Sequence, residues 1–262
     1  MPKPVIASLF ATIALGAGFG GTGHGAAAPP GVDEHALRIL RDMGTFLSSA
    51  SAFSFEAELE YDAVMADGQK ILYGARSRMW IRRPDRMRAD YVGDERESRV
   101  VYDGRTITVH DLGRNVYAAS EVPPSIDAAL DWAFDRFGFS VPIADFVYAN
   151  PGEVLLASVD GGHYAGRHAV DGVWCHHLAF TQELIDWQIW IEDGPQPVPR
   201  KLVVTYKYEP GSPQYIARIG SWNFEPRLSE SFFEYRPPAD AGVMEFLPDI
   251  EDPLEPLEED PR

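Results

Sequence analysis

The sequence is poor in cysteine and in positive charge. Cys175 is the single cysteine, so no intramolecular disulfide can form and stability must come from the core. We interpret Cys175 as a small buried residue rather than as a nucleophile. The chain has 40 acidic against 23 basic residues and a formal net charge of -17. This charge argues against nucleic acid and anionic membrane surfaces as partners, because both are bound through basic patches.

The sequence also lacks the motifs that specify common reactions. It contains no Gly-x-Ser-x-Gly elbow, no Walker loop and no dinucleotide fingerprint. The adjacent His176 and His177 should point to opposite faces of a strand, so they cannot readily share a metal ion. We therefore expect no catalytic residues, no metal, no cofactor and no enzymatic activity. A hydrolase whose site groups one of these histidines with a carboxylate and a hydroxyl is the third-ranked hypothesis.

The two ends of the chain differ in composition from the rest. Residues 1–27 combine a lysine, an apolar run and a segment of small residues, which is the pattern of a cleaved signal peptide. We expect cleavage before Ala28, with a cut before Pro29 as the alternative. No cysteine lies near this site, so we predict a periplasmic, non-lipidated protein. Residues 248–262 mix proline with acidic residues and are predicted to be a disordered tail.

The remaining residues, 28–247, are predicted to form one β-rich domain. Residues 53–65 alternate apolar with acidic side chains, which indicates a half-buried antiparallel strand. Turn signals recur at the spacing of a β-sandwich or barrel, and we count about ten strands, the last at residues 231–235. Helical periodicity predicts a first helix over residues 33–50. It also predicts a helical insert, with one helix from the N-cap Ser125 to Gly138 and shorter helices over residues 142–148 and 151–157.

Residues 173–192 contain two strands with large side chains on both faces. One face can pack under a helix, and the other must meet a second layer, a cavity or a ligand. We therefore predict a mainly β (α+β) fold, a curved antiparallel sheet or incomplete barrel closed by a few helices. The mouth of such a sheet is a common place for an apolar ligand. The alternative is an interior that aromatic side chains and helices fill completely.

Several segments resemble a known family of predicted periplasmic proteins of unknown function, numbered 2092 (DUF2092). They are residues 82–88, 102–104, 171–180, 186–191, 199–202 and 222–224. That family is similar in outline to the LolA- and LolB-like lipoprotein carrier and insertion proteins of the bacterial envelope. The resemblance implies an incomplete barrel closed by helices, with an apolar cavity for acyl chains. None of the carriers' binding residues can be assigned in this chain, because no motif matches them. The missing lipidation cysteine makes the chain look more like the soluble carriers.

Two groups of residues are candidates for ligand binding. Aromatic side chains supply large apolar area, so four of them could line a cavity, with ordinary core packing as the alternative. These are Trp80, Phe180, Trp187 and Trp190. Arg83 and Arg86 could hold a head group at the rim, because arginine binds phosphate and carboxylate in a fork geometry. The alternative for these arginines is pairing with nearby acidic residues.

The first hypothesis is therefore a non-enzymatic periplasmic carrier. It would bind a lipid, a lipoprotein acyl chain or another hydrophobic molecule as a monomer, and release it to a membrane protein of the envelope. The alternative is an envelope sensor or protein-interaction module that uses an exposed apolar patch instead of a cavity.

Overall fold

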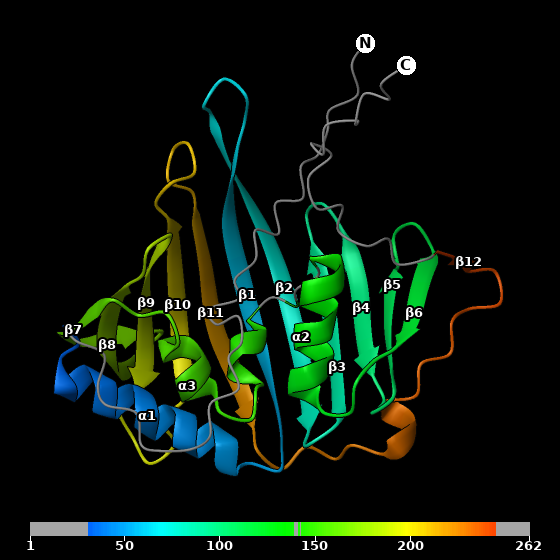
Figure 1. Ribbon diagram of the computed structural model, residues 1–262, viewed down its shortest axis with the longest axis horizontal. Coiled ribbons are helices and arrows are strands. Elements are labelled where there is room, and N and C mark those ends of the chain that lie inside the picture. Colours follow the sequence, from blue (N-terminus) through cyan, green and yellow to red (C-terminus); the bar gives the residue numbers. More distant parts are fainter. Residues whose placement is uncertain (1–30, 139–140, 142, 245–262) are drawn as a thin grey trace, which may run out of the picture.

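The computed structural model describes residues 31–138, 141 and 143–244 (Figure 1). The predicted signal peptide and acidic tail lie outside the described residues. In chain order the elements are α1 (Glu34–Ser49), β1 (Ala52–Val64), β2 (Lys70–Arg82), β3 (Arg86–Gly93), β4 (Glu97–Tyr102), β5 (Thr106–Asp111), β6 (Val116–Glu121), α2 (Ile126–Phe137), the 3-10 helix η1 (Ala144–Phe146), α3 (Pro151–Leu156), β7 (Gly161–Val170), β8 (Val173–Thr181), β9 (Ile185–Glu192), β10 (Pro199–Tyr206), β11 (Gln214–Asn223), the 3-10 helix η2 (Glu230–Phe232) and β12 (Gly242–Val243).

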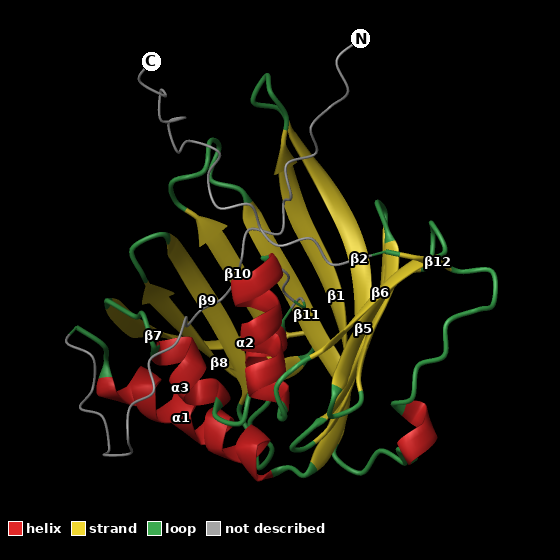
Figure 2. Cartoon of the chain, turned by 45° about the vertical axis from the view of Figure 1, so that its right-hand side comes forward, coloured by secondary structure: helices red, strands yellow, loops and turns green. Residues whose placement is uncertain are grey.

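The strands form one twelve-stranded sheet in the order β12-β6-β5-β4-β3-β2-β1-β11-β10-β9-β8-β7. All neighbouring strands are antiparallel except β12 and β6. The sheet therefore consists of two meanders that meet where β1 pairs with β11, and α2, η1 and α3 lie between them in the sequence. Figure 2 shows that the sheet is curved and open. This arrangement confirms the predicted fold class, with twelve strands in place of about ten.

The helices α1, α2, η1 and α3 lie on one side of the sheet, toward the end where β1 begins (Figures 1 and 2). We call this side the inner face. The two long predicted helices are present as α1 and α2, and the two short ones correspond to η1 and α3. The ends of α1 and α2 carry the expected signals. Asp33 Oδ1 accepts a hydrogen bond from the backbone N–H of His35 at 2.7 Å, and Ser125 Oγ accepts one from Ala128 at 3.2 Å. Gly138 ends α2 in the left-handed region, with φ of 59°. None of the described helices is long and apolar enough to cross a membrane.

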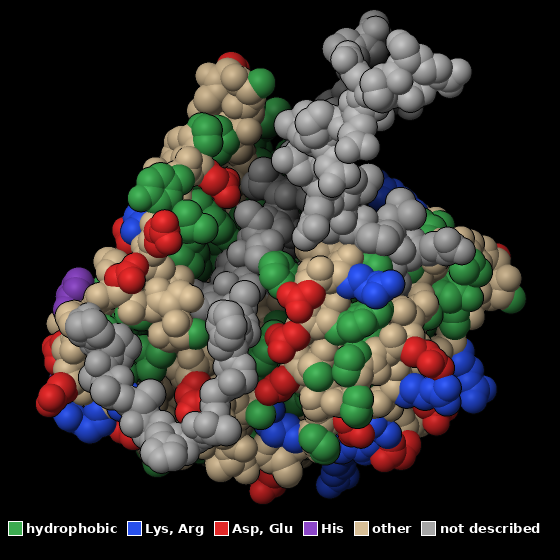
Figure 3. Space-filling model, in the orientation of Figure 1, with side chains coloured by type: hydrophobic (Ala, Val, Ile, Leu, Met, Phe, Trp, Pro, Cys, Tyr) green, Lys and Arg blue, Asp and Glu red, His purple; other side chains and the backbone are tan. Residues whose placement is uncertain are grey.

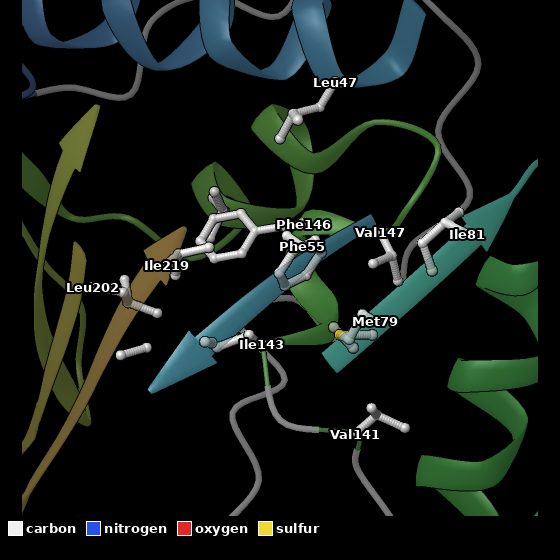
Figure 4. Packing of buried hydrophobic residues seen from close by; sticks show 14 of the residues in the cluster. Leu47, Phe55, Met79, Ile81, Val141, Ile143, Phe146, Val147, Leu202 and Ile219 are labelled. Carbon is white, nitrogen blue, oxygen red and sulfur yellow. The ribbon is translucent and has the colours of Figure 1, made fainter. Parts of the chain in front are cut away.

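The core forms between these helices and the inner face. Phe53, Phe55 and Leu59 of β1 are at most 2% exposed. Figure 4 shows Phe146 of η1 lying close to Phe55 and Ile219. On the outer face of β1, Glu56 and Glu58 form ion pairs with arginines of β2 at 3.0 and 3.3 Å. The alternation in residues 53–65 thus has the predicted meaning of one buried and one solvated face.

One predicted strand is wrong. The sequence pattern of residues 231–235 indicates a strand, but η2 (Glu230–Phe232) covers the start of that segment. The reason is that two consecutive aromatic side chains pack together. The rings of Phe232 and Phe233 meet edge to face with the centroids 5.3 Å apart, the ring of Phe232 also packs edge-on against Trp80 at 5.4 Å, and Phe233 is completely buried. A strand would send neighbouring side chains to opposite faces, whereas a 3-10 turn can bring them into contact.

Candidate functional site

The inner face continues beyond the helices toward the β1–β2 hairpin. Along β1, burial is nearly complete up to Leu59, but Tyr61 and Ala63 are partly exposed and Met65, just after the strand, is 45% exposed. The same change occurs on β2, where Met79 is buried and Ile71 is partly exposed. Figure 3 shows hydrophobic side chains along the wall of the sheet below this hairpin. We call this region the open inner face; it is apolar and accessible.

Tyrosines form a band across the boundary between the packed core and the open inner face. Tyr61 of β1 stands opposite Tyr215 of β11 and opposite Tyr73 of β2, and the rings of Tyr61 and Tyr73 have centroids 5.8 Å apart. Tyr206 of β10 and Tyr91 of β3 lie on the same face of the flanking strands. These five residues, which we call the tyrosine band, come from five adjacent strands. Side chains that share a face of neighbouring strands are within contact range.

Polar groups surround the hydroxyls of this band. Tyr61 Oη donates to Glu95 Oε2 at 2.9 Å, and it also has a side-chain hydrogen bond with Tyr91. The guanidinium of Arg96 lies 5.0 Å from the centre of the Tyr91 ring. Burial raises the pKa of Tyr215 well above its ordinary value, and nearby hydroxyls and the carboxylate of Asp145 add to this effect. The Tyr215 hydroxyl therefore remains protonated at neutral pH and can serve as a hydrogen-bond donor.

Two of the four predicted lining residues are on the inner face. Phe180 and Trp187 stack with their centroids 4.3 Å apart and are at most 1% exposed. Both therefore pack in the core, next to the band rather than on its accessible side. Trp187 of β9 stands opposite Val204 of β10, and Val204 stands opposite Tyr215 of β11 on its other side.

The other two tryptophans lie on the outer face, so they cannot line the interior. Trp80 stands opposite Ser54, and its neighbours along β2, Met79 and Ile81, face inward. Trp190 stands opposite Lys201. The ring of Trp190 stacks on His177 at a centroid distance of 3.9 Å, and Lys201 Nζ lies 4.7 Å from its centre. Both rings cover other side chains on the charged side of the sheet.

The two predicted rim arginines contact protein groups instead of an open rim. Arg83 donates to the backbone carbonyls of Val147 and Tyr148, both at 2.8 Å, and burial lowers its pKa. It thereby ties the segment after η1 to the sheet. Arg86 pairs with Asp85 at 2.9 Å and with Glu230 at 3.4 Å, which matches the alternative of pairing with acidic residues.

The two histidines point to opposite faces, as predicted, and the ring nitrogens of both have partners. His176 Nε2 lies 3.1 Å from Asp193, and its Nδ1 lies 3.1 Å from the hydroxyl of Tyr164. His177 contacts His168 and Gln188, each at 3.0 Å. His176 thus does meet a carboxylate and a hydroxyl. The hydroxyl, however, belongs to Tyr164, which links His176 to β7 and is not a nucleophile of the serine-hydrolase kind. Within the described residues, no group of three or more His, Cys, Asp or Glu could hold a metal ion.

Cys175 is fully buried, and burial raises the pKa of its thiol to about 11. A protonated, inaccessible thiol is a poor nucleophile, so the residue is structural. Two hollows of about 390 and 680 Å³ open on the outer face. Charged residues such as Glu58, Arg76 and Arg218 line them, which does not suit an apolar ligand.

The family model described as "Predicted periplasmic protein (DUF2092)" matches residues 36–247. The chain belongs to this family. The family resemblance seen in the sequence is thereby confirmed, and the family is described as periplasmic. No curated protein matches the chain.

Several solved structures are similar to the DUF2092 chain. An uncharacterised conserved protein from Thermus thermophilus has a TM-score of 0.50 at 11% identity, covering 81% of this chain and 99% of that one. A LolA superfamily protein from Nitrosomonas europaea has a TM-score of 0.37 at 12% identity, covering 76% and 97%. LprF from Mycobacterium bovis has a TM-score of 0.39 at 14% identity, covering 81% and 100%. At these identities the likeness concerns the fold alone.

The tyrosine band is the part of the site that sequence reasoning missed. Period-two alternation places Tyr61, Tyr73 and Tyr91 on inner faces, and this signal was visible. Their grouping depends on how the strands pair, and above all on β1 lying beside β11, which brings in Tyr215 from more than a hundred and fifty residues away.

Proposed function

We propose that the protein is a non-enzymatic periplasmic binding or carrier protein for a lipid, a lipoprotein acyl chain or another hydrophobic ligand. The observation that carries this proposal is the exposure along β1 and β2. The same apolar face that is sealed at Phe55 and Met79 is accessible from Tyr61 to Met65. A soluble protein rarely leaves contiguous apolar surface in contact with water unless something binds there.

The physical basis of binding would be burial of methylene groups against the open inner face. Each buried methylene contributes about 0.8 kcal/mol. A chain of ten to twelve carbons would therefore gain roughly 8–10 kcal/mol before the entropic cost of association. That is enough for specific binding and still small enough for release to a membrane acceptor.

The periplasmic description of the family agrees with this function. We further propose that residues 1–27 are removed as a signal peptide, that the protein is not lipidated, and that it acts as a monomer with a membrane protein of the envelope as its partner. We also propose that it has no catalytic activity. The partnered ring nitrogens of His176 and His177 and the buried Cys175 support this part of the proposal.

The test is detergent-free purification from the periplasm, followed by native mass spectrometry and lipid extraction. Uptake of the uncharged fluorophore N-phenyl-1-naphthylamine provides a second readout. Ile71→Asp places a carboxylate on the open inner face and should weaken probe binding at least about tenfold, because burying an unpaired charge under an apolar ligand is costly.

Leu72→Asp is the matched control, since Leu72 is the next residue on the same strand, faces outward and is 60% exposed. It should bind the probe like the wild type. A protein that carries no lipid and takes up no probe would refute the carrier function and favour an interaction module.

A further inference from the structure

The hydroxyl of Tyr215 differs from those of the other residues in the tyrosine band. Its oxygen is buried, although part of the residue stays accessible, and it has no hydrogen-bond partner among the described residues. By contrast, Tyr61 of the same band has Glu95 as its acceptor. A buried, unpaired hydroxyl is destabilising, so native structures seldom keep one without a reason.

The surroundings of this hydroxyl are polar and contain charged groups of both signs. Tyr61, Tyr91, Tyr206 and the carboxylate of Asp145 all act on Tyr215 electrostatically. Asp145 is only 4% exposed, on the helix side of the band. Arg96 lies against Tyr91 on the other side. Polar groups from the sheet and from η1 thus meet at the inner end of an apolar surface.

These charges discriminate between classes of head group. An anionic head would have one arginine nearby but would be repelled by Asp145 and by Glu95, which contacts Tyr61. A cationic head would be attracted by these two carboxylates but would be repelled by Arg96, which lies against Tyr91. An uncharged oxygen group loses little hydration energy and can still exchange a hydrogen bond with a tyrosine hydroxyl.

We propose that Tyr215 binds the uncharged, oxygen-bearing head group of a lipid, a hydroxyl or an ester, while the lipid chain lies on the open inner face. This inference rests on the proposed carrier function and specifies its ligand. Tyr215 sits beside the packed core, whereas Ala63 and Ile71 lie farther along the same face toward the hairpin. The head group therefore points inward, and the chain extends toward the β1–β2 hairpin.

The test compares four ligands that share a ten-carbon chain: 1-decanol, methyl decanoate, decanoate and decane. Each displaces N-phenyl-1-naphthylamine from the wild type, from Tyr215→Phe and from Tyr208→Phe at pH 8. Tyr208 is 73% exposed in the loop after β10 and serves as the control for removing a hydroxyl. Near-UV circular dichroism verifies that each variant is folded.

The wild type should bind decanol and methyl decanoate more tightly than decane and decanoate. Tyr215→Phe should raise the Kd of decanol about fivefold, the loss expected for one neutral hydrogen bond, and leave that of decane unchanged. Tyr208→Phe should change neither.

Equal Kd values for decanol and decane, tightest binding by decanoate, or an unchanged decanol Kd in Tyr215→Phe would each overturn the head-group assignment. In those cases the binding of decane still supports the carrier function. If neither decane nor the fluorophore binds, the carrier function itself fails, and this assignment fails with it.

Discussion

Replacing Tyr215 by phenylalanine should stabilise the ligand-free protein. The hydroxyl oxygen is buried and unpaired among the described residues, and such a group costs about 1–3 kcal/mol of folding free energy. Part of the residue stays accessible, so we take the lower end of this range. The free energy of unfolding should therefore rise by about 1 kcal/mol in Tyr215→Phe, which is roughly 2–4 °C in Tm for a chain of this size.

Urea unfolding followed by tryptophan fluorescence measures this change. The midpoint should increase with an unchanged m-value, because the substitution hardly alters the surface exposed on unfolding. Two other substitutions set the scale. Tyr208→Phe should leave the midpoint unchanged, and Tyr61→Phe should lower stability by about 0.5–1 kcal/mol, because it removes the 2.9 Å hydrogen bond to Glu95.

The result that refutes this reasoning is a loss of stability in Tyr215→Phe equal to that in Tyr61→Phe. The Tyr215 hydroxyl would then be hydrogen-bonded in the free protein, and nothing would reserve it for a ligand. Higher stability together with weaker decanol binding in Tyr215→Phe is the signature of a binding group. Removing a hydroxyl with a structural role would instead lower both the stability and the affinity for decanol.

Two further predictions concern the scaffold. A Cβ atom at Gly44 of α1 would lie 2.8 Å from backbone atoms of Gly152 in α3. Gly44→Ala should therefore force the two helices apart and lower the free energy of unfolding by about 2 kcal/mol. Gly220→Ala, with open space around the new Cβ atom, should change the free energy of unfolding little in the same urea titration. Burial alone would raise the pKa of Asp90, but hydrogen bonds from two arginines, Arg99 at 2.7 and 2.8 Å among them, outweigh burial and lower it. The stabilisation by Asp90 is therefore fully present above the unfolded-state pKa of about 3.9 and is lost as the pH falls through the lower native value. Asp90→Asn should destabilise by about 2 kcal/mol at pH 7 and should reduce the loss of stability between pH 4 and pH 2; an unchanged acid profile would contradict this account.

The features of the fold that could be predicted are those that depend on local periodicity. Residues 53–65 alternate between apolar and acidic side chains, so the inner and outer faces of β1 follow from the pleat alone. Asp33, Ser125 and Gly138 mark helix ends because their side-chain and backbone chemistry acts within one turn. The pattern of residues 1–27 likewise determined the predicted compartment, and the acidic net charge determined the prediction that nucleic acid is not a partner.

Tertiary structure decided what lies next to what. Alternation shows that Trp80 and Trp190 share faces with charged neighbours, but only the completed sheet shows which face the helices cover, and so which tryptophans are inside. Likewise, Tyr61 and Tyr215 become neighbours only through the pairing of β1 with β11. Such pairings bring together residues distant in sequence, and the burial of one hydroxyl depends on all the strands and helices around it, which no local pattern encodes.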